Sequence, residues 1–237
     1  MAISINSTTA AETALVNTTS QSVVLNVADG SNRLLLLGVT LNLTNNESVV
    51  GTVDASFGGI PLDVAVMTSG GAGAAYWFYQ VNPETGSQTA SWTLVGETSA
   101  GMKMVVICLD GAAQSAPATS TAQHITFGAA TSASSLAITP VADNSWIFDH
   151  FSNFNGAATV SQGSAQNLVV ADLTGTSFTM GISYESQSGS PVEATMSWVA
   201  SLTNRMDQVV IAISPFVVAV SSIPRWPAYN GFWGATA

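Results

Sequence analysis

The chain contains two histidines, His124 and His150, and a metal or acid–base site would need partners that converge on one of them. Asp149 precedes His150, but neighbours on a β-strand point to opposite faces, so these two side chains cannot form a site by themselves. The sequence has no H-E-x-x-H, C-x-x-C, G-x-S-x-G or P-loop pattern. We therefore expect structural histidines, no metal, no cofactor and no nucleophilic catalysis.

Paired carboxylates are the remaining route to catalysis, because two of them from distant strands can flank a glycosidic bond. The candidates are Asp149, Asp172, Glu185 and Glu193. Nothing in their spacing selects two of them, and solvated acids at turns and strand edges are the more common interpretation. We expect that the chain is not an enzyme, and glycan cleavage remains the weakest alternative.

Aromatic side chains could instead bind a sugar. Tyr76, Trp77, Phe78 and Tyr79 are consecutive, which places two aromatic rings on each face of one expected strand. Exposed coplanar rings would make a glycan-binding platform, whereas core packing with one half-exposed face is the more common reason for such a run. Glycan binding is therefore kept as an alternative.

A second group of aromatic residues lies near the end of the sequence. Pro215 cannot donate a hydrogen bond to a continuing strand, and Pro224 and Pro227 restrict the following chain to extended conformations. The anchors expected for an interface are Arg225, Trp226, Tyr229, Phe232 and Trp233. We expect residues 217–237 to form an arm that docks on another subunit; the alternative is a lid over an edge of its own sheet.

Composition limits the class of protein. Only 8% of residues are charged, 47% are hydrophobic, and the formal net charge is −10. Four basic residues cannot make the positive surface that nucleic acid needs, and the acidity opposes anionic membranes. The longest apolar run is far shorter than the ~20 residues that cross a bilayer. We expect no nucleic acid, no membrane and a surface that is covered by other protein.

Short runs of Val, Ile, Leu, Thr and aromatic residues alternate with Gly, Asn, Asp, Ser and Pro clusters, which predicts an all-β chain. Many short strands at near-regular spacing favour an antiparallel β-sandwich. We expect an extended N-terminal arm over residues 1–20, a sandwich over 21–216 and the C-terminal arm over 217–237. Residues 34–37 and 105–109 are continuously apolar, as in strands covered on both sides.

Three short matches suggest an internal repeat. Residues 27–31 resemble 141–145, residues 91–92 resemble 197–198, and residues 104–107 resemble 208–211, at offsets of 114, 106 and 104 residues. The matches keep their order, so two pseudo-repeated halves over 21–110 and 121–216 are one interpretation. A single composite sandwich is preferred, because neither half shows an obvious core of its own.

Taken together, residues 22–39, 57–62, 76–79, 82–83 and 209–213 resemble a family of jelly-roll-like β-sandwich domains. Such domains occur in phage virion proteins and in bacterial surface proteins, and the resemblance covers about residues 20–216. The matching residues form turns and core, so the resemblance implies a fold and a setting but no catalytic residue.

We therefore expect a structural protein of a viral (phage) particle, as coat, decoration or tail component. Its partners would be copies of itself and other virion subunits, and it would be assembled in the host cytoplasm and later released. The alternative is a carbohydrate-binding or adhesive module on a cell surface or fibre tip.

Overall fold

The computed structural model describes residues 2–13, 18–43, 53–70, 73–95, 99–171 and 178–217. Within these ranges every regular element is a β-strand, so the expected all-β sandwich is confirmed. The strands are β1 (Ser4–Thr13), β2 (Ser20–Val27), β3 (Leu34–Leu43), β4 (Val53–Phe57), β5 (Ile60–Pro61), β6 (Asp63–Gly70), β7 (Gly73–Val81), β8 (Gly86–Leu94), β9 (Ser99–Asp110), β10 (Ala118–Ile138), β11 (Trp146–Asn153), β12 (Val160–Gln162), β13 (Asn167–Val170), β14 (Thr179–Ser186) and β15 (Ala194–Ile213).

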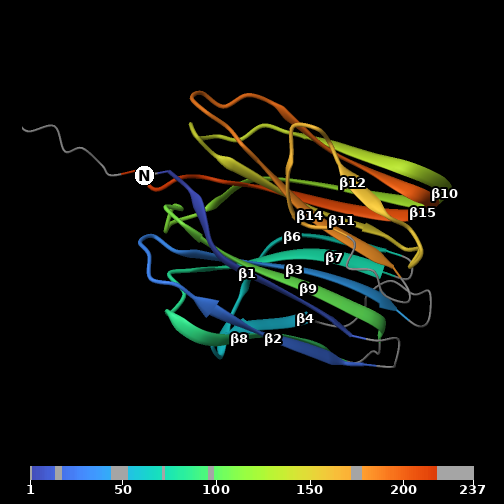
Figure 1. Ribbon diagram of the computed structural model, residues 1–237, viewed down its shortest axis with the longest axis horizontal. Helices are drawn as coiled ribbons and strands as arrows, with labels where there is room; N and C mark the ends of the chain where they lie inside the picture. The colour runs from blue at the N-terminus through green and yellow to red at the C-terminus, as the bar shows by residue number, and fades with distance from the viewer. Residues whose placement is uncertain are drawn as a thin grey trace, which may run out of the picture.

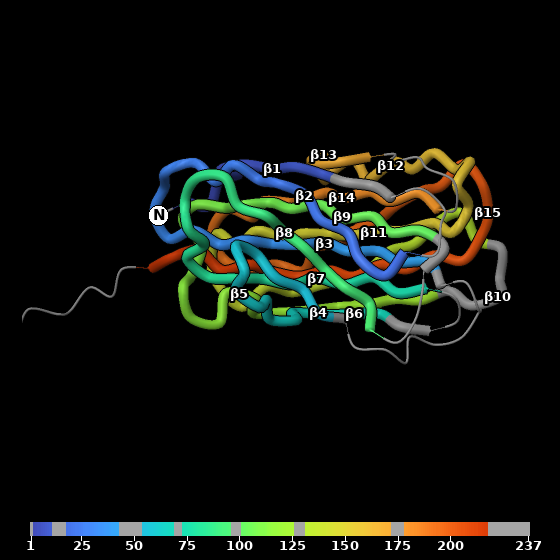
Figure 2. The backbone as a smooth tube through the Cα atoms, turned by 90° about the horizontal axis from the view of Figure 1, so that it is seen from below, coloured from blue at the N-terminus to red at the C-terminus, as the bar shows by residue number. Residues whose placement is uncertain are grey.

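The strands form three antiparallel sheets (Figure 1). One has the order β1-β9-β3-β7-β6 and a second has the order β2-β8-β4-β5. The third has the order β10-β15-β11-β14-β13, with β12 paired to β15. Strands β10 and β15 run beside each other for most of their length, and Figure 2 shows this pair reaching one end of the molecule.

The third sheet folds over itself. The ladder between β10 and β15 is irregular between Thr126 and Ala133. Beyond this point Met196, near the start of β15, belongs to the same buried apolar cluster as Val210, near the end of the same strand. Each of the two long strands therefore contributes one part to an inner layer and another part to an outer layer. Together with the two sheets of the first half, this gives the molecule four layers of strands.

The two halves of the chain repeat one strand order. The inner layer of the first half, β1-β9-β3-β7-β6, corresponds to the first part of β10, the last part of β15, β11, β14 and β13. The outer layer β2-β8-β4 corresponds to the last part of β10, the first part of β15 and β12. Each half is a jelly roll-type sandwich, and we call them the first and the second sandwich.

The sequence matches fall on corresponding strands. Trp92 lies on β8 and Trp198 on the first part of β15, and both side chains are fully buried. Residues 104–107 lie on β9, and residues 208–211 lie on the last part of β15. The third match lies before equivalent inner strands. Residues 27–31 precede β3, and residues 141–145 precede β11.

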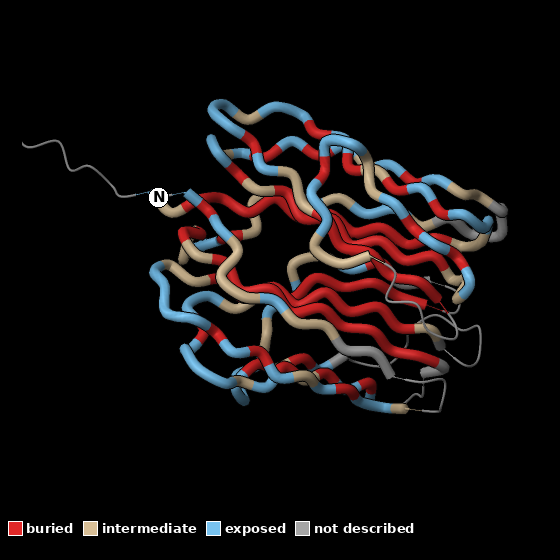
Figure 3. Tube along the Cα trace, viewed as in Figure 1, coloured by how far each residue is buried: buried red, intermediate tan, exposed pale blue. Residues whose placement is uncertain are grey.

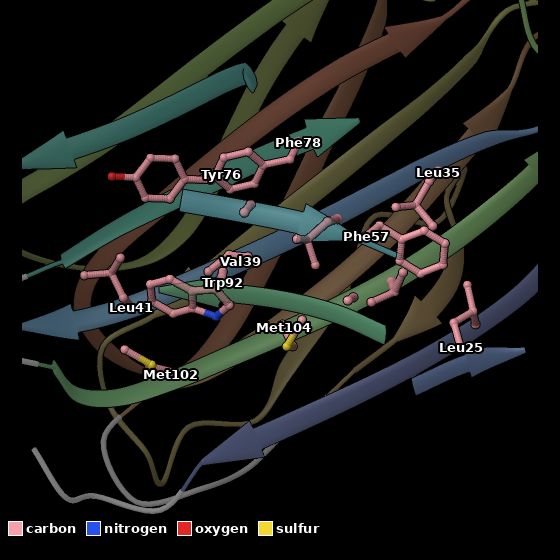
Figure 4. Packing of buried hydrophobic residues seen from close by; sticks show 14 of the residues in the cluster. Leu25, Leu35, Val39, Leu41, Phe57, Tyr76, Phe78, Trp92, Met102 and Met104 are labelled. Atoms are coloured by element: carbon pink, nitrogen blue, oxygen red, sulfur yellow. The ribbon is translucent and has the colours of Figure 1, made fainter. Parts of the chain in front are cut away.

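Three apolar cores hold the layers together. The first core lies between the two sheets of the first sandwich and includes Leu35, Leu37 and Trp92 (Figure 4). The interface core joins the inner sheets of the two sandwiches through Leu34, Leu36 and residues of β11, β14 and β15. The second core consists of two smaller clusters inside the second sandwich. Figure 3 shows the buried strands concentrated in the two inner layers.

Two expectations about organisation need correction. Each sandwich has apolar clusters of its own, although neither core was evident in the sequence. Residues 4–13, expected within an N-terminal arm, form β1 and pair with β9 from Ser4↔Asp110 to Thr13↔Met102. The sequence did not reveal this strand because it is rich in small polar residues. Among its described side chains, Ile5 and Ala10 pack against the interface core, next to Ile3 just before the strand.

Candidate functional site

The aromatic run is buried. Tyr76 and Phe78 lie in the first core with their rings stacked at 5.5 Å, and Trp77 lies in the interface core. The alternation of faces is as expected, but β7 lies in an inner sheet that is covered on one face by the outer sheet of the first sandwich and on the other by the second sandwich. Tyr79 is half-buried. The proposed glycan platform of Tyr76, Trp77, Phe78 and Tyr79 is therefore wrong, because three of its four rings are buried.

The candidate acids are not gathered at an open cleft. Asp149 on β11 has no exposed surface, so a polysaccharide cannot reach it. Glu185 on β14 is half-buried, and burial raises its pKa. Glu193 is exposed just before β15, and Asp172 lies outside the described residues.

Asp149 is the centre of a polar network inside the second sandwich. Its Oδ2 atom accepts hydrogen bonds from Trp198 Nε1 at 2.9 Å and from Gln208 Nε2 at 2.8 Å. Gln166 Nε2 lies 3.5 Å from the same oxygen and donates at 2.6 Å to Ser183 Oγ. Three donors therefore fix one carboxyl oxygen.

The other oxygen, Oδ1, is buried without a partner in the structure. Burial raises the pKa of Asp149 to about 7, although the hydrogen bonds from Gln208, Trp198 and Gln166 oppose the shift. Removing the carboxylate from water is thus the larger effect.

The first sandwich has an apolar counterpart to this network. Asp149 stands opposite Val210, as Leu37 stands opposite Val106, so Asp149 corresponds to Leu37. By the same pairing, Gln208 corresponds to Met104 and Ser183 to Phe78. Sequence reasoning missed Gln166, Gln208 and Ser183, because polar residues from two strands and a loop carry no common motif.

His150 lies on the other face of β11, in the interface between the sandwiches. Its Nδ1 donates to the Tyr76 carbonyl at 3.3 Å, so Nε2 is the acceptor for Thr40 Oγ1 at 2.5 Å. Thr40 Oγ1 then accepts from Ser152 Oγ at 2.6 Å. Burial lowers the pKa of His150 to about 3, so the ring is neutral and structural, as expected.

The described basic residues all bond within the molecule. Arg33 donates to the carbonyls of Gly30 at 2.7 Å and Pro83 at 3.0 Å. Lys103 is buried and donates to the Phe178 carbonyl at 2.6 Å. Arg205 forms an ion pair with Asp207 at 2.8 Å. Three of the four positive charges in the sequence are thus committed to internal contacts, and the fourth, Arg225, lies outside the described part.

A groove of about 910 Å³ opens at one end of the interface between the sandwiches. Its apolar side includes Ile3, Trp146 and Phe216. Its polar side includes Asp143, Asn144, Ser186 and Gln187. The last described residue, Val217, lies at the groove and is 75% exposed.

The described residues show neither a metal-binding cluster nor a membrane-spanning helix. They bring together no group of three His, Cys, Asp or Glu side chains that could hold a metal ion. They contain no helix with the length and hydropathy of a membrane span. Cys108 is buried in the first core, and this burial raises its pKa to about 12, so the thiol stays protonated.

The predicted arm residues Arg225, Trp226, Tyr229, Phe232 and Trp233 lie outside the described residues. Comparison with known proteins adds no relative, because neither a family model nor a curated protein matches the chain. The groove and the outer surfaces therefore carry the functional argument.

Proposed function

We propose that the chain is a structural subunit of a viral (phage) particle, as coat, decoration or tail component. It acts by packing against copies of itself and against other virion subunits. The observation that supports this most directly is the small, nearly uncharged surface of the two outer layers.

On the first outer sheet, most of the outward positions on β2, β8 and β4 are filled by small polar residues. They are Ser20, Ser22, Val24 and Asn26 on β2, Ser87, Thr89, Ser91 and Thr93 on β8, and Asp54 and Ser56 on β4. On the second outer layer they are Ala133, Ser135 and Ala137 on β10, Thr195, Ser197 and Val199 on β15, and Ser161 on β12. Among these positions Asp54 is the only charged residue.

Such faces suit assembly for a physical reason. Burying a charge against protein costs the hydration of that charge. These faces carry almost no charges, so covering them avoids this cost. A chain with few surface charges is also poorly protected against self-association. Both properties favour a working state in which the faces are covered.

Light scattering over the micromolar range tests the proposal. The wild-type protein is expected to form a defined oligomer with contacts above ~1,000 Å². Thr89→Lys places a charge at the centre of the first outer face. It should raise the protein concentration needed for assembly at least tenfold. Thr85→Lys makes the same change in an exposed turn and is the matched control.

A wild-type protein that stays monomeric at every concentration would contradict the proposal. A glycan array and a hydrolysis screen address the two rivals. Turnover that depends on one carboxylate would favour the enzyme, and saturable glycan binding without turnover would favour the adhesive module.

A further inference from the structure

We propose that the groove beside Trp146 receives the aromatic segment of a second copy of this chain, residues 224–233, with Arg225 of that copy beside Asp143. This inference rests on the proposed assembly function and names the contact that it would use. The arrangement would be reciprocal, so that each subunit offers one groove and one segment.

The corresponding end of the first sandwich is covered, which makes the groove conspicuous. After β9 the chain crosses the start of β3, where Ala112 is fully buried and Gln114 Nε2 donates to the Arg33 carbonyl at 3.0 Å. After β15 the corresponding position is taken by Phe216 and Val217. Here the groove stays open beside the start of β11, at Trp146.

The composition of the following chain matches the groove. Residues 218–237 contain four large aromatic residues and a single charge, Arg225. The groove offers an apolar side around Trp146 and Ile3, and one carboxylate, Asp143. The three other basic side chains already bond within the molecule, so Arg225 is the base available to Asp143.

The sequence before the segment favours docking on a neighbour over a return to its own groove. Val217 lies at the groove, so a return would require the chain to reverse within residues 218–223, Val-Ala-Val-Ser-Ser-Ile. This stretch contains no Gly, Asn, Asp or Pro, Ser221 and Ser222 are only weak turn formers, and its Val and Ile residues favour extended chain. Six residues span ~20 Å when extended, which is long enough for the aromatic segment to reach the groove of a neighbouring copy.

A charge exchange tests the contact in full-length protein. Asp143→Arg places two arginines together, and Arg225→Asp places two aspartates together, so each variant alone should need at least tenfold more protein to assemble. Mixing the two variants should restore assembly, because every contact between unlike copies then pairs Arg with Asp. The matched control is Asp29→Arg, at the equivalent turn of the first sandwich, which should assemble like wild type.

Two further variants address packing. Trp226→Ala should weaken assembly about 30-fold, as expected for loss of a buried tryptophan anchor. Ser186→Tyr fills the groove from its exposed rim and should have a similar effect. Circular dichroism should show unchanged β structure in all variants.

The outcomes separate this inference from the function on which it rests. If wild type is a monomer at all concentrations, the assembly function fails. If wild type assembles and the Asp143, Arg225 and Ser186 variants assemble equally well, only the groove contact is refuted. If the single charge variants are impaired but mixing restores nothing, the segment does not pair with the groove of another copy, and the proposal is overturned.

Discussion

Asp149 and His150 are adjacent on β11, but their side chains lie in different cores. The Asp149 carboxyl lies inside the second sandwich, and the His150 ring lies between the two sandwiches, 5.6 Å from the Trp77 ring. Burial raises the pKa of Asp149 to about 7 and lowers that of His150 to about 3. Both groups are thereby driven towards their neutral forms, which has opposite consequences for stability against pH.

Asp149→Asn should remove a loss of stability with rising pH. Between pH 3.8 and about 7 the folded protein holds a proton at Asp149 that the unfolded chain has lost, so stability falls as the pH rises. The full effect is on the order of 4 kcal/mol. In denaturant unfolding from pH 4 to 8, the free energy of unfolding of the variant should increase relative to that of wild type as the pH rises. A constant difference over this range would show that Asp149 titrates normally.

His150→Gln should reveal the opposite slope. Between about pH 3 and 6.5 the unfolded chain binds a proton at His150 that the folded protein does not, so stability rises with pH. This effect is also on the order of 4 kcal/mol, and the variant should lose less stability than wild type on acidification. The same unfolding series measures it, and the double variant with Asp149→Asn should lack both contributions. Parallel profiles of His150→Gln and wild type would refute the assignment.

Trp198→Phe should cost more than Trp92→Phe, although the two tryptophans occupy equivalent positions. Trp198 Nε1 donates to Asp149, whereas Trp92 Nε1 is buried without an acceptor in the structure. Losing a hydrogen bond to a charged group costs about 1.5–3 kcal/mol beyond the shared loss of ring volume. Chemical denaturation at pH 8 compares the two variants. Equal losses would mean that the Asp149 network adds no stability.

A chain cut between Gln114 and Ser115 should remain associated. Each half has its own core, but the inner sheets would expose Leu34, Leu36 and Trp77 if the halves separated. Size-exclusion chromatography of the co-expressed fragments should give one peak with the β spectrum of the intact protein. Either fragment alone is expected to aggregate. Two soluble, separate fragments would contradict the role of the interface core.

The sequence was informative where hydrophobic periodicity is strong. The continuous runs 34–37 and 105–109 correctly indicated strands covered on both faces, and the paired motifs around Trp92 and Trp198 fall on equivalent strands. Strand β1 was missed because Ser, Thr and Asn dominate it.

The buried site was beyond sequence reasoning for a different reason. Asp149 is held by Gln166, Trp198 and Gln208, which lie 17, 49 and 59 residues away along the chain. Only the folding over of β10 and β15 brings them together. The burial of Trp77 likewise depends on a second sandwich that packs on the first, which no local pattern records.

Because the two sandwiches pack face to face, the two outer faces of the molecule are not equivalent. The exposed ends of the four-layer stack belong to different halves, and one carries Asp54 while the described positions of the other carry no charge. Contact between two like ends closes a pair and stops, whereas contact between unlike ends leaves a free end of each kind and can repeat without limit. Under the proposed assembly function, contact between like faces gives a closed pair and contact between unlike faces gives a growing filament, and Asp54 is the charged side chain that differs between the two described faces.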